Sequence, residues 1–276
     1  MILKIKFNNI LRYILIFFVL VGIGGLFFLW LEDNKKEKEL EKKEIEAIQK
    51  GINFLLATDK KFVGAATITI KDFNEICKNE KIDKLWREKV EEDIGQFNFM
   101  DPLYSSVYPD LTVSELNDIP EETNRIIAKA VYCKKVPQES ILKEINELER
   151  DGGYNSTHIL KAISIATRED CYEDNFFPLI IDLVDELSKK EDEEGKRDDL
   201  CGDNIGLDLY NERAAFISEM GFPLKDSWIE NIIRCQQADG KYGGYSDGGD
   251  SDSELLSTHT TALGLYALIA DLGYCK

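Results

Sequence analysis

The sequence predicts an all-α protein that consists of one N-terminal transmembrane helix and an array of helical hairpins. Residues 13–31 form an uncharged apolar run. From residue 137 onward, apolar residues recur at the three- and four-residue spacing of amphipathic helices. Strand signals are sparse, because the one alternating β-branched run, residues 65–70, is short.

The apolar run has the length of a membrane-spanning helix, which takes ~20 apolar residues. A secretory signal peptide is the alternative, but it would end in a small-x-small cleavage site. This run instead ends in bulky residues, Leu26 to Leu31. We therefore expect an N-terminal flank (1–12), an uncleaved signal anchor (13–31), a charged helical stalk (32–44) and one large domain (45–276).

The location of that domain is argued from charge and from cysteine. The lysines that follow the anchor outnumber the basic residues before it, which favours a cytoplasmic domain. Against this, a short N-terminal tail usually stays inside, and a long domain crosses the membrane largely regardless of charge. All six cysteines lie outside the anchor, and an even number favours disulfides in an oxidising compartment; buried free thiols are the alternative. We expect a single-pass membrane protein with its body outside the cytoplasm.

The formal net charge of −18 excludes one class of partner. Nucleic-acid binding relies on lysine and arginine to neutralise phosphates, so no nucleic-acid partner is expected. The lipid bilayer, contacted through residues 13–31, is the predicted partner. The acidity otherwise indicates a soluble surface.

The first elements of the domain follow from apolar spacing and proline. An amphipathic segment continues the stalk to about Leu56, residues 71–96 form one or two helices, and residues 97–112 form a loop. Pro120 precedes two glutamates, a good helix start, and Pro137 starts a helix that contains Ile141 and Ile145.

The later elements end or begin at glycine and hydroxyl residues. Asp151-Gly152-Gly153 stops the helix that begins at Pro137, and Ser156 or Thr157 caps the next one. Further helices are expected at residues 175–190, 205–220, 224–238 and 256–272, with a charged loop at 189–199. The last helix is apolar nearly all round, so it is expected in the interior.

The only two histidines share one local pattern. Residues 141–166 and 228–269 each read as an amphipathic helix, Asp-Gly, a tyrosine, Ser-Thr-His and an apolar helix. Such repeats predict helix pairs that stack on their neighbours. His158 and His259 would each lie in a first turn, where the helix dipole favours a neutral ring with a structural role; ligand or catalytic roles are the alternative.

The second repeat resembles a known family. Gln236-Gln237, Asp239-Gly240 and Tyr242-Gly243-Gly244, followed by His259-Thr260-Thr261-Ala262-Leu263, are similar to the repeat of terpenoid cyclases and protein prenyltransferases. The resemblance covers residues 224–272, more weakly 138–167, and residues 48–64 as a degenerate first repeat. It implies an α/α toroid, either closed or an incomplete ring. In that family these repeat residues are mostly structural, so the resemblance implies a fold more strongly than an activity.

The resemblance also implies candidate chemistry. Protein prenyltransferases bind zinc through an Asp-x-Cys pair and a later histidine, which implies Asp199, Cys201 and His259 as zinc ligands here. The aspartate-rich loop lies in the wrong place for the general acid of a terpene cyclase. Cys201-Gly202-Asp203-Asn204 is similar to the Cys-Gly-Glu-Gln of thioester proteins, but the Asn204 side chain is one methylene too short.

The glycine-rich loop before the last helix is a candidate calcium site, because hard oxygen ligands cluster there. A solvated turn before a helix N-terminus, where acids are favoured, is the alternative. The candidate calcium ligands are Asp247, Asp250, Asp252 and Glu254.

If the two repeats face the same way, polar residues of both line one rim. The candidate catalytic residues there are His158, His259, Asp151 and Asp250. The candidate ligand-binding residues are Tyr154, Tyr242 and Tyr245, with Asp247 on the same rim.

We therefore expect a toroid that binds a ligand or partner in its concave face. One alternative is an enzyme that acts on a cell-envelope polysaccharide or lipid at the rim around His158 and His259. The other is a zinc-dependent, prenyltransferase-like enzyme.

Overall fold

The computed structural model describes residues 30, 32–57, 111–171, 176–243 and 251–273, and in the last range it describes side chains from residue 257 onward. The chain divides into two compact units, Met1–Lys43 and Glu44–Lys276. In the first unit, residues 32–43 are helical, as predicted for the stalk. Of the predicted anchor, only Trp30 belongs to the described residues. No helix in the described ranges has both the length and the hydropathy that a bilayer crossing requires.

The described part of the second unit is helical and contains no strand, which confirms the all-α prediction for these residues. Residues 65–70, the candidate strand, lie outside them. The elements are a helical segment at residues 44–57, α4 (Val113–Asn117), α5 (Glu122–Val131), α6 (Gln138–Glu147), α7 (Tyr154–Arg168), α8 (Phe177–Glu194), η5 (Leu200–Gly202), α9 (Asn204–Glu219), α10 (Asp226–Cys235) and α11 (Ser251–Leu272).

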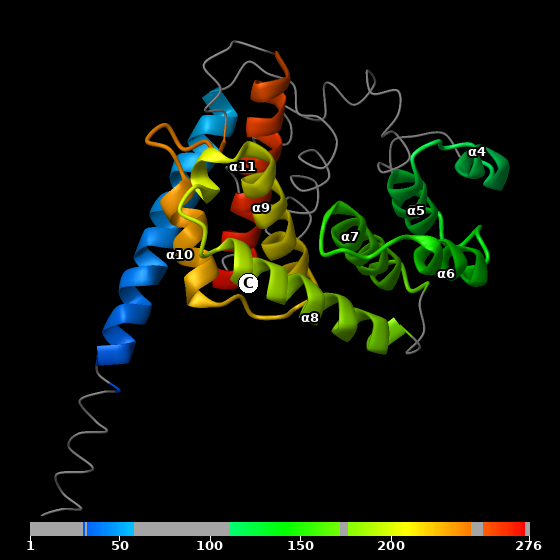
Figure 1. The fold of residues 1–276 in the computed structure, drawn as a ribbon, viewed down its shortest axis with the longest axis horizontal. Helices are drawn as coiled ribbons and strands as arrows, with labels where there is room; N and C mark the ends of the chain where they lie inside the picture. The colour runs from blue at the N-terminus through cyan, green and yellow to red at the C-terminus, as the bar shows by residue number, and fades with distance from the viewer. Residues whose placement is uncertain (1–29, 31, 58–110, 172–175, 244–250, 274–276) are drawn as a thin grey trace, which may run out of the picture. The chain divides into compact units, whose positions relative to one another are not determined.

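Alternate helices form the centre of this unit (Figure 1). α5 packs on α7, α7 on α9, and α9 on α11, and the α9–α11 pair makes the most extensive contact. α6 packs on α5, whereas α8 packs on both α7 and α9. The central helices are lined with fully buried residues such as Ile163, Ala214 and Leu263. The central helices thus pack on one another in the order α5, α7, α9 and α11.

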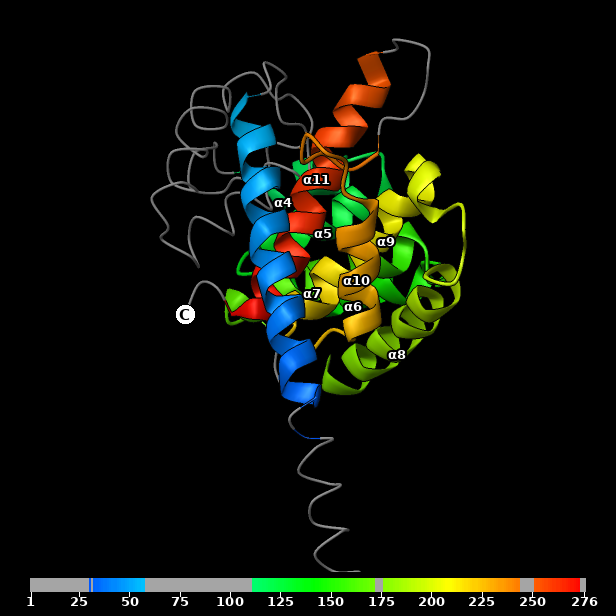
Figure 2. The ribbon, with the colours of Figure 1, turned by 90° about the vertical axis from the view of Figure 1, so that its left-hand side faces the viewer.

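The last loop of the unit is fixed to its first helix. Gln236 donates from Nε2 to the carbonyl oxygens of Ala47, at 2.8 Å, and Gly240, at 3.1 Å. Gly51 lies so close to Leu265 of α11 that a Cβ would stand 2.6 Å from its Cδ2. Residues 44–57 therefore run beside α11 and the loop that precedes it (Figure 2).

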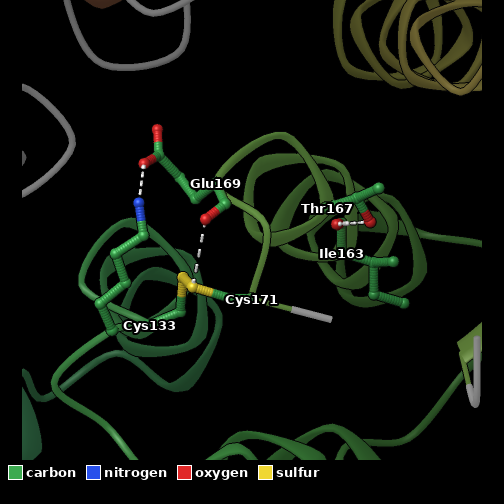
Figure 3. Close-up of a disulfide and its surroundings, with 6 residues drawn as sticks. Cys133, Ile163, Thr167, Glu169 and Cys171 are labelled. Carbon is green, nitrogen blue, oxygen red and sulfur yellow. Dashed lines mark hydrogen bonds and ion pairs between the residues drawn. A yellow bond between two sulfur atoms is a disulfide. The ribbon is translucent and has the colours of Figure 1, made fainter. Parts of the chain in front are cut away.

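Two disulfides connect helix ends. Cys133, just after α5, is bonded to Cys171, just after α7 (Figure 3), and Cys201 of η5 is bonded to Cys235, the last residue of α10. This confirms disulfide formation for these four residues, and no described cysteine is free. Cys77 and Cys275 lie outside the described residues.

Three predicted boundaries are wrong. α7 begins at Tyr154 with Gly153 as its N-cap, because the Ser156 and Thr157 hydroxyls are hydrogen-bonded to glutamates of other helices instead of capping. α8 continues to Glu194, well into the predicted charged loop. α11 begins at Ser251 rather than at residue 256.

Candidate functional site

The site begins with two carboxylates on the central helix α9. Asp208 and Glu212 are four residues apart, so their side chains lie on one face of the helix. Each side chain is only 2% exposed. Carboxylates are rarely this buried unless they are paired, so their partners define what the site can do.

Three groups surround Asp208. Nδ1 of His259, from α11, lies 2.7 Å from Asp208 Oδ1. The hydroxyl of Thr260 donates to the same oxygen at 2.5 Å, and the hydroxyl of Tyr154, from α7, donates to Oδ2 at 2.9 Å. Asp208 therefore joins α7, α9 and α11, and it fixes which edge of the His259 ring faces the protein.

The second histidine reaches the same helix through Glu212. His158 Nδ1 lies 3.6 Å from Glu212 Oε1, and the Thr157 hydroxyl donates to that oxygen at 2.5 Å. His158 Nδ1 also lies 2.6 Å from the carbonyl oxygen of Tyr154. Because a carbonyl oxygen only accepts, Nδ1 carries the proton in the neutral ring, and Nε2 offers a lone pair.

The prediction that both histidines lie in a first turn is wrong. His158 is the fifth residue of α7, and His259 is the ninth residue of α11. Burial alone would lower the pKa of His259, but the charge and hydrogen bond of Asp208, with Glu212, outweigh burial and raise it. The dipole argument therefore fails for His259, because buried carboxylates, not helix N–H groups, surround it.

Burial also changes the acids of the site. It raises the pKa of the Glu212 carboxyl, although His158, His259 and Thr157 oppose the shift. Burial, followed by the charge of Asp208, raises the pKa of the Tyr154 hydroxyl. Tyr154 is therefore a hydrogen-bond donor at neutral pH.

The geometry brings metal-ligating atoms together. One carboxylate oxygen from each of Asp208 and Glu212 and one ring nitrogen of His259 all lie within 4.8 Å of one another. The His158 and His259 side chains stay 21% and 20% exposed, so an ion or small molecule can reach the imidazoles while the carboxylates stay behind them.

The zinc ligand set implied by the resemblance does not form. Cys201 is bonded to Cys235, so it has no thiolate for a metal ion. Asp199 binds the guanidinium of Arg197 at 3.0 Å, and His259 instead binds Asp208. The residues present therefore do not fit a prenyltransferase-type zinc centre.

Other predicted rim residues lie elsewhere. Tyr242 is fully buried, and its backbone N–H donates to the Thr261 hydroxyl, so it is not a surface contact for a ligand. Asp151 is exposed and accepts from the N–H of Gly153 in its own turn. The structure does not describe Tyr245, Asp247 and Asp250, nor the side chains of Asp252 and Glu254.

The structure adds two residues that the sequence analysis missed, Asp208 and Glu212. The available signal was their four-residue spacing in a helix whose other residues are largely apolar. We name the group formed by Tyr154, His158, Asp208, Glu212 and His259 the histidine face.

A second buried charge lies further along α7 and α9. Lys161 donates to both oxygens of Glu219, at 3.0 and 2.9 Å, and the Ser164 hydroxyl donates to Glu219 Oε1. The ammonium group also lies 5.2 Å from the centre of the Phe216 ring, within cation–π range. Glu219 thus has a permanent cation, whereas the carboxylates of the histidine face have imidazoles.

No family model, curated protein or solved structure matches this chain. The geometry of the site is therefore the basis for its proposed function.

Proposed function

We propose that this protein is a membrane-anchored, extracytoplasmic, toroid-like helical domain that binds a ligand at the histidine face. One observation carries the proposal. The only two histidines of the chain come from different helices, contact adjacent buried carboxylates of α9, and keep about a fifth of each side chain exposed.

Three observations support the anchor, the location and the toroid. Residues 13–31 have the composition and length of a signal anchor. Two disulfides suit an oxidising compartment. The central helices α5, α7, α9 and α11 pack on one another, and α6 and α8 pack on them, which is a feature that α/α toroids share.

The oriented imidazoles support binding rather than a role in packing alone. Asp208 and the Tyr154 carbonyl hold the two Nδ1 atoms, so each imidazole is fixed in orientation before a ligand binds. Thr157, Thr260 and Tyr154 hold the carboxylates in place. Such preorganisation reduces the entropy lost on binding.

Thermal denaturation of the full chain in detergent micelles tests the proposal. The panel consists of cell-envelope saccharides, lipids and divalent cations. A ligand at 100 times its Kd stabilises the folded state by about 2.7 kcal/mol. We expect at least one compound to raise the Tm of the wild type but not of His259→Ala. The proposal would be contradicted if every compound that raises the Tm of the wild type raised the Tm of His259→Ala by the same amount.

The Asp208–His259 pair favours a second candidate, an enzyme that acts on a cell-envelope polysaccharide or lipid. A carboxylate that orients an imidazole is a common arrangement for general acid–base catalysis. Release of reducing ends or fatty acids from isolated envelopes by the wild type, but not by Asp208→Asn, would support it. Equal release by both proteins would exclude this pair as the catalytic group.

Thiol mapping tests the location. Cells are lysed in the presence of an alkylating reagent, and cysteine peptides are identified without reduction. The proposed location requires Cys133, Cys171, Cys201 and Cys235 to resist alkylation. Four alkylated cysteines would place the domain in a reducing compartment.

A further inference from the structure

Negative charge in the histidine face has no permanent cation beside it. Among the residues that the structure describes, no lysine or arginine forms an ion pair with Asp208 or Glu212, although both are 2% exposed. Their polar contacts are His259, Thr260 and Tyr154 at Asp208, and Thr157 and His158 at Glu212. A buried carboxylate is normally paired or bound to a metal ion.

Two other buried carboxylates, Glu219 of α9 and Glu191 of α8, each have a fixed cation beside them. Glu219 is paired with Lys161, and Glu191 lies 3.5 Å from the guanidinium of Arg213, which also forms two hydrogen bonds with Glu194. Both of these sites therefore contain a fixed positive charge. The histidine face lacks such a charge.

The donor atoms suit a metal ion. Carboxylate oxygens and imidazole nitrogen bind zinc and similar ions at about 2.0–2.2 Å, so ligand atoms around a tetrahedral ion stand roughly 3.4 Å apart. In the structure the three candidate atoms lie within 4.8 Å of one another, and His259 Nδ1 and Asp208 Oδ1 are 2.7 Å apart. An ion would take the place of the proton between these two atoms and widen their separation by less than an ångström.

The residues around the ligands hold them in position, as metal sites require. The Thr260 and Tyr154 hydroxyls donate to Asp208, and the Thr157 hydroxyl donates to Glu212. Outer partners of this kind orient metal ligands and are worth 10- to 100-fold in affinity, as an order of magnitude.

We infer that the histidine face binds one divalent transition-metal ion through Asp208, Glu212 and His259. This inference rests on the proposed ligand-binding function and names the class of its ligand. The imidazole selects against magnesium and calcium, which prefer oxygen ligands alone, and two carboxylates neutralise the charge of a divalent ion. His158 and Tyr154 remain beside the ion and outside its ligand set.

Zinc titration of the full chain in detergent micelles, purified without a polyhistidine tag, is the first test. Isothermal titration calorimetry should show one high-affinity Zn²⁺ per chain, which excess Mg²⁺ or Ca²⁺ does not displace. His259→Ala and Asp208→Asn should weaken binding by at least about 100-fold, the upper end of the effect of losing an outer partner.

His158→Ala is the matched comparison, because it removes the other histidine, an outer partner of Glu212, without removing a proposed ligand. It should weaken zinc binding by about tenfold, the lower end of the effect of losing an outer partner, and so clearly less than His259→Ala. A second control, Asp247→Asn/Asp250→Asn, removes acids of the candidate calcium loop and should leave zinc binding unchanged.

The wild type alone provides a test that does not depend on the folding of variants. Since the chain has two histidines, a long-range ¹H–¹⁵N spectrum contains two imidazole patterns, and zinc should shift the nitrogens of His259 much more than those of His158. The His158→Ala spectrum assigns them.

Three outcomes would overturn the inference. The first is that zinc does not bind in stoichiometric amounts, and the second is that Ca²⁺ displaces it. The third is that His158→Ala or the loop variant loses as much zinc affinity as His259→Ala. If zinc fails but an organic compound depends on His259, the proposed function stands and the metal inference falls. If no compound depends on His259, both fall.

Discussion

The two histidine-containing repeats have the same sequence pattern but use it differently. In the first repeat (residues 138–168, α6 and α7), Tyr154 is 36% exposed and donates to Asp208; in the second (residues 226–272, α10 and α11), Tyr242 is fully buried. Both repeats nevertheless place an imidazole against a carboxylate of α9. The shared pattern thus encodes the path of the chain and the position of the histidine, whereas the tyrosine depends on the local loop.

The residues that follow the histidines differ as well. Lys161 lies three positions after His158 and is paired with Glu219, whereas Ala262 lies three positions after His259 and is fully buried. The glycine after aspartate has positive φ in both repeats, 73° at Gly152 and 97° at Gly240. These matched positions allow the comparison to be tested by paired substitutions.

The disulfides give the largest expected effect. Cys133–Cys171 flanks the first repeat, whereas Cys201–Cys235 connects η5 to α10 of the second, and the bonded cysteines are 38 and 34 residues apart. Loop-closure entropy gives each a stabilisation of about 4 kcal/mol. We expect the free energy of unfolding to fall by similar amounts in two double variants, Cys133→Ser/Cys171→Ser and Cys201→Ser/Cys235→Ser. Denaturant unfolding followed by circular dichroism measures both. A difference above about 2 kcal/mol would show that loop length does not explain their effects.

Lys161→Met should lower the free energy of unfolding by about 3 kcal/mol, because it leaves Glu219 buried without its ammonium partner. Arg168, 3.9 Å from Glu219, compensates in part. The double variant Lys161→Met/Glu219→Leu is the control and should recover most of the loss in the same unfolding measurement. If the double variant were as unstable as Lys161→Met, the loss of stability would come from the packing of the Lys161 side chain and not from its charge.

Gly240→Ala should destabilise the domain by about 2 kcal/mol more than Gly152→Ala. Both positions have positive φ, so the backbone strain is common to both. A Cβ at Gly240 would stand 2.2 Å from the backbone oxygen of Lys50, whereas at Gly152 it would meet the movable Lys190 side chain at 2.4 Å. Equal losses in urea unfolding would contradict a rigid contact between the last loop and the first helix.

The tyrosines give the smallest effect, with opposite signs. Tyr154→Phe removes the hydrogen bond to Asp208 and should cost about 1 kcal/mol. Tyr242→Phe removes a buried hydroxyl that has no hydrogen-bond partner among the described residues, so it should stabilise the domain by about 1 kcal/mol. Thermal unfolding measures both effects. Two changes of the same sign would contradict the proposed difference between the two tyrosines.

The helices were predictable where apolar spacing is regular. α5, α6, α9 and α10 begin within a few residues of their predicted positions, because one face of each packs on a neighbour. The starts of α7 and α11 were not predictable from capping rules. Ser156 and Thr157 are hydrogen-bonded to distant glutamates, and such tertiary partners are not visible in a local pattern.

The site was predictable only in part. The histidines were found because they are rare and repeat in one setting. Asp208 and Glu212 were missed because the chain has 52 acidic residues, most of which are expected on a solvated surface. Only their burial distinguishes these two from the others. The zinc set failed because the pairing of Cys201 with Cys235 cannot be deduced from cysteine spacing.

The contact between Gln236 and Ala47 has a consequence for biosynthesis. The two residues are 189 positions apart, so the first helix of the domain leaves the ribosome long before its partner loop exists. At the usual rates of synthesis, the delay is roughly 10 to 40 s. During that interval Ile48, Ile52 and Leu55, which are buried in the finished domain, lack the last loop and α11. The nascent chain therefore has a defined period in which a chaperone can bind it, and this period ends only after the final repeat has been made.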